Sequence, residues 1–213
     1  MKRIGIIGSG DLGRLIGHHA PACGNFEVAC FFDDYAQEGL TIQEIPVAGG
    51  LHAIESAYES GRFDLLMVGI GYNHMAFRKS VFERFCGKIP FASLIHPSCF
   101  VDPTVKMGEG CFLLPGCTLD TGVELGNNVL LNTAVTIAHD TKIGHHSFLA
   151  PAAALAGKTI LGECCIIGIN CTIIDNLRIG NFIRIAAGAV VLDSFDQAGM
   201  YAGVPAVLKK KFN

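Results

Sequence analysis

The chain has few charged residues and no long hydrophobic run. Aspartate, glutamate, lysine and arginine together make up 16% of its 213 residues, and the formal net charge is −3. A surface that follows phosphates needs clustered lysines and arginines, and Lys209–Lys211 is the only such cluster, so the composition argues against nucleic acid as a partner. No apolar stretch approaches the roughly 20 residues of a membrane helix, which argues against a membrane protein.

The sequence also lacks the marks of export and of a cysteine-bound metal. Lys2 and Arg3 precede an apolar stretch, but Gly5, Gly8 and Gly10 interrupt it, which is not typical of a signal peptide. None of the nine cysteines forms a CxxC pair, so a thiolate metal site is not favoured. We therefore expect a cytoplasmic protein whose thiols are reduced.

A strict six-residue period is the dominant pattern of the chain. A helix repeats its apolar face every three or four residues and a strand every two, so neither explains this period. It predicts a parallel β-helix, in which three hexads form one triangular coil of eighteen residues and coils stack about 4.8 Å apart. The seventeen aliphatic residues of the repeat are Ile95, Val101, Met107, Leu113, Leu119, Leu125, Leu131, Ile137, Ile143, Leu149, Leu155, Leu161, Ile167, Ile173, Ile179, Ile185 and Val191.

Small residues occupy two further positions of the hexad. Four positions after the aliphatic residue stands a second inward residue, often β-branched or small, and five cysteines fall there: Cys99, Cys111, Cys117, Cys165 and Cys171. A thiol fills a small apolar space, so we expect these cysteines to be structural. Glycine often follows the aliphatic residue, as at Gly126, Gly144 and Gly162, which we ascribe to corners that need unusual backbone angles.

Residues 1–94 instead alternate short apolar strands with helical stretches, the pattern of βαβ units. Residues 4–7 form a predicted strand, and the motif Gly8-Ser9-Gly10-Asp11-Leu12-Gly13 follows it at the start of a helix. A second strand, residues 28–32, ends in Asp33 and Asp34, with Asp33 twenty positions beyond Gly13. Glycines and an acid at this spacing are typical of a nucleotide fold, in which backbone amides approach a diphosphate and the acid meets a ribose hydroxyl.

About 90 residues are enough for one half of a dinucleotide fold. We therefore expect a single nucleoside diphosphate group to bind there, with Gly8, Ser9, Gly10, Asp33 and Asp34 as candidate substrate-binding residues. A nucleotide fold that has lost its ligand is the alternative.

These parts in this order resemble the bacterial sugar-nucleotide N-acetyltransferases of the PglD type and their NeuD-type sialic acid O-acetyltransferase relatives, in the left-handed β-helix (hexapeptide repeat) superfamily. The similarity spans nearly the whole chain, in the segments Gly8–Gly13, Phe31–Asp34, Ile95–Ser98, Ala138–Asp140, Ile143–Gly144, Leu155–Gly157, Gly168–Asn170 and Ala202–Ala206. The resemblance implies a Rossmann-like α/β half-domain for the nucleotide sugar in residues 1–94. It implies an all-β left-handed parallel β-helix with a C-terminal tail, the acetyltransferase domain, in residues 95–213.

His139 is the candidate general base. It holds the third position of its hexad, on a corner where side chains point outward. Gly157 follows one coil later and should stack about 5 Å from it. The resemblance implies that His139 deprotonates the acceptor with support from Asp140. It also implies that acetyl-CoA lies with its thioester against Gly157 and its pantetheine arm against Ile169 and Ala187.

Two residues depart from the PglD-type pattern. Phe148 stands where those enzymes have a second histidine of the acetyl-CoA site, so it is a candidate cofactor contact. Leu12 stands where they often have a histidine before the last glycine of the loop. The resemblance implies that the acetyl-CoA groove lies between neighbouring prisms, so we expect a homotrimer.

Three functions remain open at this stage. The leading one is direct transfer of acetyl from acetyl-CoA, without a metal, to the amino group of a nucleotide-linked amino-deoxysugar for surface-glycan synthesis. The alternatives are O-acetylation of a sugar hydroxyl and a non-catalytic nucleotide-binding trimer. Zinc bound by His139, His145 and His146 is not favoured, because six residues place His139 and His145 on different corners. His74 is expected to be an ordinary surface or packing residue.

Overall fold

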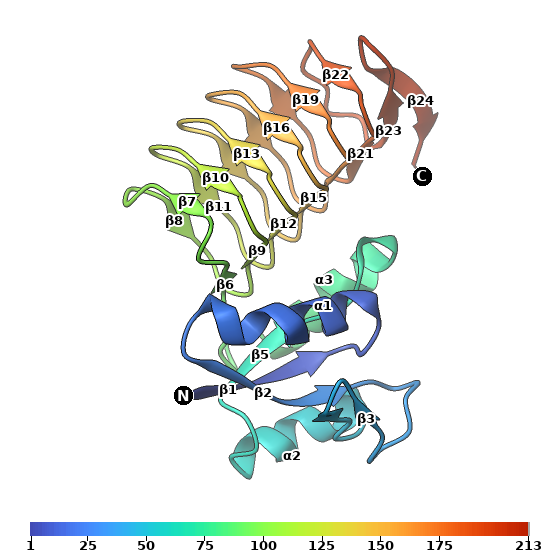
Figure 1. Cartoon of the computed structure of the whole chain (residues 1–213). Coiled ribbons are helices and arrows are strands. Elements are labelled where there is room, and N and C mark those ends of the chain that lie inside the picture. The colour runs from blue at the N-terminus through green and yellow to red at the C-terminus, as the bar shows by residue number, and fades with distance from the viewer. Residues whose placement is uncertain (213) are drawn as a thin grey trace. The chain divides into compact units, whose positions relative to one another are not determined.

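The computed structural model describes residues 1–212 and contains two compact units (Figure 1). The first unit is Met1–Pro97 and the second begins at Ser98, three residues beyond the boundary expected from the hexads. Within the described residues, no helix combines the length and the apolar content that a bilayer crossing requires.

The first unit is a small parallel sheet with helices on both faces (Figure 1). Strands β1, β2 and β5 pair in the order β2-β1-β5. Its main elements are β1 (Lys2–Ile7), α1 (Asp11–His19), β2 (Phe26–Phe32), α2 (Ile54–Glu59), β5 (Leu65–Val68) and α3 (Met75–Phe85). Its shorter elements are η1 (Ala20–Cys23), β3 (Thr41–Ile42), β4 (Ile45–Pro46), η2 (Leu51–Ala53), η3 (Tyr72–His74) and β6 (Leu94–Ile95).

Alternation along β2 directs its side chains to two different layers. Phe32 joins the core cluster that α2 and α3 contribute to through Ile54 and Phe82. Phe31 points to the opposite face, as period-2 alternation requires. There it meets α1, since a Cβ on Gly13 or Gly17 would lie 3.6 Å from its ring. The glycines of α1 therefore allow this helix to pack closely on the sheet.

The second unit is a parallel β-helix with three sides. The first side contains β7 (Phe100–Val101), β10 (Thr118–Leu119), β13 (Thr136–Ile137), β16 (Ala154–Leu155), β19 (Thr172–Ile173) and β22 (Val190–Val191). The second contains β8 (Lys106–Met107), β11 (Glu124–Leu125), β14 (Lys142–Ile143), β17 (Ile160–Leu161) and β20 (Arg178–Ile179). The third contains β9 (Phe112–Leu113), β12 (Leu130–Leu131), β15 (Phe148–Leu149), β18 (Ile166–Ile167) and β21 (Ile183–Ile185), followed by β23 (Gly199–Ala202) and the antiparallel β24 (Val207–Lys211).

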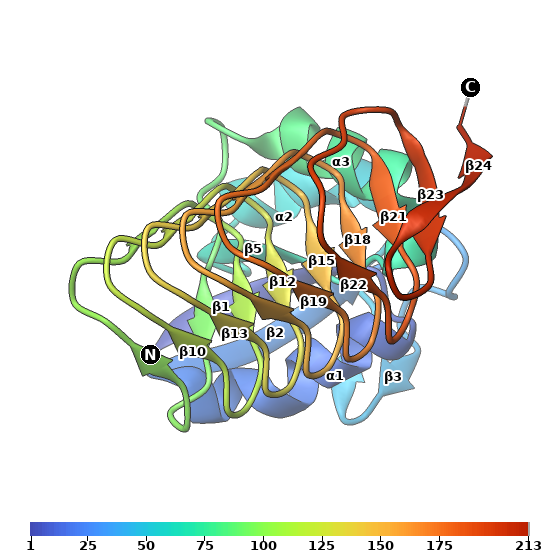
Figure 2. The same cartoon turned by 90° about the horizontal axis from the view of Figure 1, so that it is seen from above.

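Successive coils are in register at eighteen residues, as the hexads predict. Leu119 pairs with Ile137, and Ile137 pairs with Leu155. Figure 2 shows the coils following one another along the chain. We name the corners by their residues: the first corner comprises 120–122, 138–140, 156–158 and 174–176; the second 108–110, 126–128, 144–146, 162–164 and 180–182; the third 114–116, 132–134, 150–152, 168–170 and 186–188.

The aliphatic row forms the core of this unit. Of the seventeen residues, the fourteen from Leu113 to Val191 are buried and the first three are half-buried. At the second inward position Cys111, Cys117, Cys165 and Cys171 are buried as predicted, whereas Cys99 is half-buried; none of them forms a disulfide. Burial raises the pKa of Cys165 and of Cys171 to about 12, so these thiols stay protonated and serve as packing groups.

Glycine follows the aliphatic residues for a different reason from the one expected. Gly126, Gly144 and Gly162 do not have positive φ angles; in their hexads the positive angles fall two residues later, at Asn128, His146 and Cys164. A Cβ on Gly144 would instead lie 2.4 Å from the backbone carbon of Gly162. The second corner therefore needs glycine because adjacent coils touch there, and the expectation of unusual angles at these glycines was wrong.

Gly144→Ala should destabilise the β-helix by about 1–3 kcal/mol, because the obstructing atoms belong to the backbone of the next coil and cannot rotate away. Urea unfolding followed by far-UV circular dichroism measures this. The control is Asp193→Ala at an exposed position, which should change the free energy of unfolding by less than about 0.5 kcal/mol. Equal unfolding midpoints for the two variants would contradict the close-approach explanation.

Candidate active site

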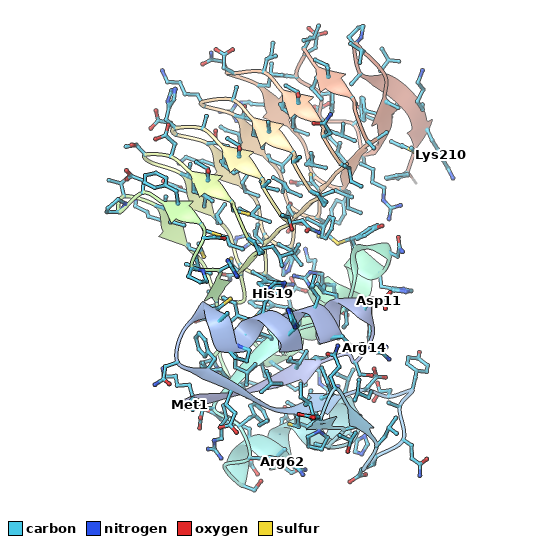
Figure 3. All side chains as sticks on the ribbon, in the orientation of Figure 1. Met1, Asp11, Arg14, His19, Arg62 and Lys210 are labelled. Carbon is cyan, nitrogen blue, oxygen red and sulfur yellow. The ribbon has the colours of Figure 1, made fainter. Side chains whose placement is uncertain are left out.

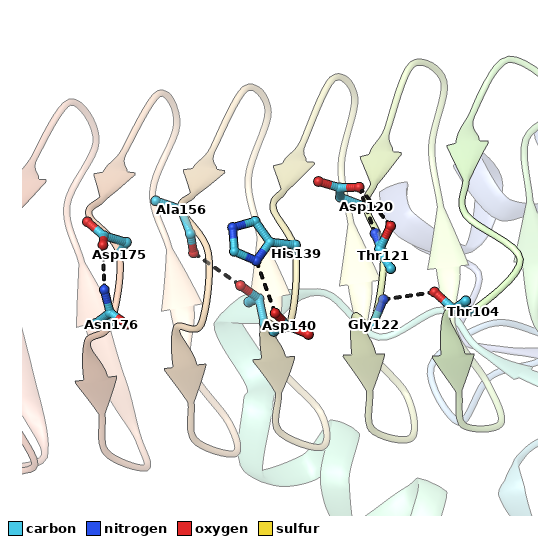
Figure 4. A network of polar contacts seen from close by, with 10 residues as sticks. Thr104, Asp120, Thr121, Gly122, His139, Asp140, Ala156, Asp175 and Asn176 are labelled. Atoms are coloured by element: carbon cyan, nitrogen blue, oxygen red, sulfur yellow. Dashed lines mark hydrogen bonds and ion pairs between the residues drawn. The ribbon is translucent and has the colours of Figure 1, made fainter.

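His139 and Asp140 form a hydrogen-bonded pair on the first corner (Figure 4). His139 Nδ1 lies 3.0 Å from Asp140 Oδ2, and the two side chains are 52% and 57% exposed. An ionised carboxylate only accepts hydrogen bonds, so Nδ1 carries the proton of the neutral ring. The lone pair is then on Nε2, the nitrogen that a general base needs free.

The fold of the corner brings the two side chains together. Asp140 has a φ of +58°, and its amide donates to the carbonyl of Thr121 in the preceding coil at 2.9 Å. A Cβ on Gly122 would lie 2.7 Å from Asp140 Oδ1. Gly122 thus leaves room for the carboxylate, and it could have been found in the sequence because it precedes Asp140 by eighteen residues.

Gly157 stacks against the imidazole on the other side. A Cβ at Gly157 would lie 2.5 Å from His139 Nε2 and 2.7 Å from Cε1. The Lys158 amide donates to the His139 carbonyl at 2.9 Å, which fixes this stack by backbone hydrogen bonding. His139 Nε2 therefore lies over a glycine, and any side chain at position 157 would collide with the ring.

Acidic groups surround the pair on the first corner. Asp120 lies in the preceding coil, where its Oδ1 accepts from the Thr121 amide at 2.7 Å. Asp175 lies two coils after His139 and accepts a hydrogen bond from Asn176 (Figure 4). With Asp140, three carboxylates share this corner with Lys158 as the one ammonium, so the field around His139 favours a group that carries positive charge.

The remaining predicted cofactor residues lie elsewhere on the coil. Ile169 and Ala187 are exposed on the third corner, and Ile169 is 55% exposed. Phe148 lies in β15 on the third side and is only 7% exposed. The whole first side separates the third corner from the first, a span on the order of 15 Å for about five extended residues. One chain therefore does not bring these residues to His139.

The first unit contains a pocket of about 430 Å³ at the carboxyl ends of its strands. Of the predicted substrate residues, Gly8, Gly10, Asp33 and Asp34 line it and Ser9 does not. The lining also includes residues beyond the glycine motif and Asp33–Asp34 that sequence reasoning missed: Tyr35, Leu51, Gly69, Ile70, Gly71, Asn73, His74 and Phe77. The volume lies within the range of small-molecule sites.

The glycine loop has the approach distances of a nucleotide fold. A Cβ on Gly13 would lie 2.0 Å from the Gly8 carbonyl oxygen, so the third glycine permits close packing of helix and strand. Gly8 has a φ of +96°, which favours glycine. A Cβ on Gly10 would meet nothing within 4 Å, so the second glycine faces open space.

Asp33 is engaged with the glycine loop itself. Its Oδ2 accepts from the Ser9 amide at 2.8 Å and from the Ser9 hydroxyl at 2.7 Å, and its Oδ1 accepts from the Tyr35 amide at 2.9 Å. Burial alone would raise the pKa of Asp33, but the hydrogen bonds from Ser9 and from the amides of Tyr35 and Ala36 outweigh it and lower the pKa. Asp34 differs: its Oδ1 accepts from the Leu51 amide at 2.8 Å and its side chain is exposed.

His74 was expected to be an ordinary surface or packing residue, and the structure places it in the pocket lining. It ends η3, which follows the segment Gly69-Ile70-Gly71 at the end of β5. The carboxyl ends of neighbouring parallel strands meet at one edge of a sheet. Gly69 and Gly71, which follow the apolar run of residues 65–68, were therefore the available signal for the second wall of this pocket.

His145 and His146 form hydrogen bonds within the second corner. His145 Nδ1 accepts from the Asn127 amide at 2.9 Å, and His146 Nδ1 lies 3.1 Å from Asn128 Nδ2. Both rings thus bind groups one coil earlier. In the part of the chain that the structure describes, no group of three or more metal-ligating side chains occurs.

Residues 3–85 match the family of PglD N-terminal domains. A comparison with curated protein sequences finds no significant match. Among solved structures, the acetyltransferase domain of PglB from Neisseria gonorrhoeae is 27% identical, with a TM-score of 0.89 over 98% of this chain and 100% of that chain. PerB from Caulobacter crescentus, solved with CoA and GDP-perosamine, is 29% identical, with a TM-score of 0.90 over 98% of both chains.

A third structure, WeeI from Acinetobacter baumannii, is 22% identical with a TM-score of 0.83 over 98% of this chain and 100% of that chain, and shows the fold alone. The resemblance to PglD/NeuD-type sugar-nucleotide acetyltransferases is confirmed, as is the left-handed β-helix behind a small α/β unit. The predicted enzyme class, an acetyl-CoA-dependent acyltransferase, is confirmed with them.

Asp33→Asn should remove a pH-dependent stabilisation of the first unit. The folded-state pKa of Asp33 lies below the usual 3.8, so its carboxylate stabilises the fold above about pH 4, and this contribution is lost as the pH falls through the folded-state pKa. We expect a loss of about 1–2 kcal/mol near neutral pH. Urea unfolding at about pH 7 and about pH 3 measures it, with exposed Glu59→Gln as control. A deficit that is equally large at both pH values would contradict this account.

Proposed function

We propose that the chain transfers the acetyl group of acetyl-CoA to the amino group of a nucleotide-linked amino-deoxysugar, in the cytoplasmic synthesis of bacterial surface-glycan precursors. The observation that carries this proposal is the His139–Asp140 pair stacked over Gly157. Support comes from similarity, over 98% of this chain, to an acetyltransferase domain solved with acetyl-CoA and to a protein solved with CoA and GDP-perosamine. None of the nine cysteines is paired in a disulfide in the described residues, in line with the reducing compartment proposed here.

His139 acts as the general base of this reaction. The acceptor ammonium first releases one proton to solvent. Nε2 of His139 then accepts a second proton as the neutral amine nitrogen attacks the thioester carbonyl, and this proton passes to the departing thiolate. Asp140 holds the ring in the tautomer with Nδ1–H and stabilises the imidazolium that forms. The Gly157 amide is the candidate donor to the oxyanion. The stacked column is Thr121, His139, Gly157 and Asp175, which offers no cysteine or serine nucleophile and favours direct transfer.

We propose a homotrimer because the cofactor residues of one chain lie on two corners. His139 and Gly157 belong to the first corner, whereas Ile169 and Ala187 belong to the third. An extended pantetheine arm contacts both sets only in a groove where the first corner of one chain faces the third corner of another, and three chains around an axis create three such grooves. Phe148 joins this site only if the neighbouring chain supplies it.

An amine is favoured over a hydroxyl as the acceptor. Sugar amines carry positive charge near neutral pH, and Asp120, Asp140 and Asp175 create a negative field at the first corner. A neutral hydroxyl gains nothing comparable from this field. The nucleotide part of the acceptor is assigned to the pocket of the first unit, lined by Gly8, Gly10 and Asp34 among others.

The proposal is tested by mass spectrometry of products from the purified protein, acetyl-CoA and a panel of UDP-, dTDP- and GDP-linked amino sugars and their hydroxyl counterparts. One added acetyl group on an amino sugar, absent from its hydroxyl counterpart, is the expected result. Acetylation of the hydroxyl counterpart alone would identify an O-acetyltransferase. Binding of nucleotide without any product would identify the non-catalytic trimer.

His139→Asn should lower kcat by about 10²–10⁴ while the fold and the oligomer persist, because the general base is lost. The matched control is His145→Asn, since asparagine stands at positions 127 and 181 in the column of His145 and accepts the same kind of amide hydrogen bond. The control should keep kcat within about twofold. Steady-state rates and molar mass in solution are the measurements. Full activity of His139→Asn would show that His139 is not the general base.

Gly157→Ala should impair transfer by about 10²-fold or more, because the new methyl group would occupy the space of the His139 ring and displace Nε2. Stability should change by less than about 1 kcal/mol, since the obstructing atoms belong to an exposed side chain that can rotate. Rate and unfolding midpoint are measured on the same preparation. An unchanged rate would show that the stacked geometry is irrelevant to transfer.

A further inference from the structure

The pocket of the first unit is acidic where a nucleotide fold usually receives phosphates. Asp11, Asp33 and Asp34 all line it, and of the lining residues that the structure describes none is lysine or arginine. Three carboxylates repel a diphosphate that carries two or more negative charges. The lining instead suits a nucleoside: carboxylates accept from base N–H and ribose O–H groups, and Tyr35 and Phe77 offer exposed aromatic rings at 98% and 46%.

Two hydrogen-bond donors of the glycine loop are already used within the protein and are not available to a phosphate. The Ser9 amide and hydroxyl both donate to Asp33, so neither is directed at a ligand. Leu12, in the first turn of α1, lines the pocket with an apolar side chain. A diphosphate held at this loop therefore needs a positive group from outside the pocket lining.

Arg14 is the candidate for that group, because it is the arginine bonded to the glycine loop. It lies on α1 directly after Gly13, and Figure 3 shows it on the same helix as Asp11. Its Nε donates to the Ser9 carbonyl at 3.0 Å, which ties the guanidinium to the glycine loop. Its two Nη groups make no hydrogen bond within residues 1–212, and the side chain is exposed. A guanidinium with one edge fixed and its Nη groups free is arranged for bidentate binding of a phosphate.

We propose that Arg14 binds the diphosphate of the acceptor at the rim of the pocket, while the pocket itself takes the nucleoside. This inference rests on the proposed function, since it assumes a nucleotide-linked acceptor. It divides recognition in two: Arg14 supplies affinity for any nucleoside diphosphate, and the pocket lined by Asp34 and Tyr35 selects the base and ribose.

The test compares nucleoside diphosphates with nucleosides by isothermal titration calorimetry on the full chain. The probes are UDP, dTDP and GDP, each beside uridine, thymidine or guanosine. Arg14→Gln should raise the Kd of the best-bound nucleoside diphosphate at least tenfold, about the effect of losing a charge-assisted hydrogen bond. The Kd of the corresponding nucleoside should stay within about twofold. Arg14→Lys should restore part of the diphosphate affinity, because lysine keeps the charge and loses the fork.

Arg62→Gln is the matched control, an exposed arginine of the same unit outside the pocket lining (Figure 3), and should bind like the wild type. In acetyl-transfer assays Arg14→Gln should raise the KM for the acceptor and leave the KM for acetyl-CoA unchanged. If the wild type transfers acetyl and Arg14→Gln binds the diphosphate as tightly, or loses nucleoside and diphosphate affinity equally, the inference fails and the proposed function stands. If the wild type binds no nucleotide and transfers no acetyl, both fail.

Discussion

The in-register stacking of eighteen-residue coils is the constraint on which the second unit depends. Each coil donates backbone hydrogen bonds to the next without slippage, from Phe100 to Cys117 and onward to Val190. A slip of one residue would turn the aliphatic row outward and place outward residues such as Lys142 in the core. The buried row and the backbone ladder therefore select the same register. This agreement explains why two-residue strands, which are too short to be stable alone, suffice here.

The same register places glycines that are distant in sequence on either side of the His139–Asp140 pair. Gly122, Asp140 and Gly157 come from three successive coils, and each position matters only because eighteen residues bring it beside the next. The glycines provide the space that the side chains of His139 and Asp140 occupy. Because the corner is fixed by backbone hydrogen bonds on both sides, the exposed imidazole is held by a rigid support rather than by a mobile loop.

The sequence predicted most of what depends on period and less of what depends on side-chain partners. The row from Leu113 to Val191 and the alignment of His139 with Gly157 follow from counting. The reason for glycine at position 144 could not be predicted by counting. Glycine is needed either where φ is positive or where a neighbouring atom leaves no room for a Cβ, and only the packed coils show which applies. In the first unit, Asp33 has the spacing of a ribose ligand but accepts from Ser9, and His74 reaches the pocket through a short loop whose path no period encodes.

The repeat also determines how this protein can change in length. Adjacent coils pair only at a spacing of eighteen residues. The distance from His139 to the C-terminal hairpin of β23 and β24 can therefore change only in steps of one coil, about 4.8 Å each. A deletion or insertion that respects this step preserves every buried row, and any other shifts all rows beyond it. The length of the β-helix beyond His139 therefore changes by whole coils, through duplication or loss of eighteen residues, and not gradually.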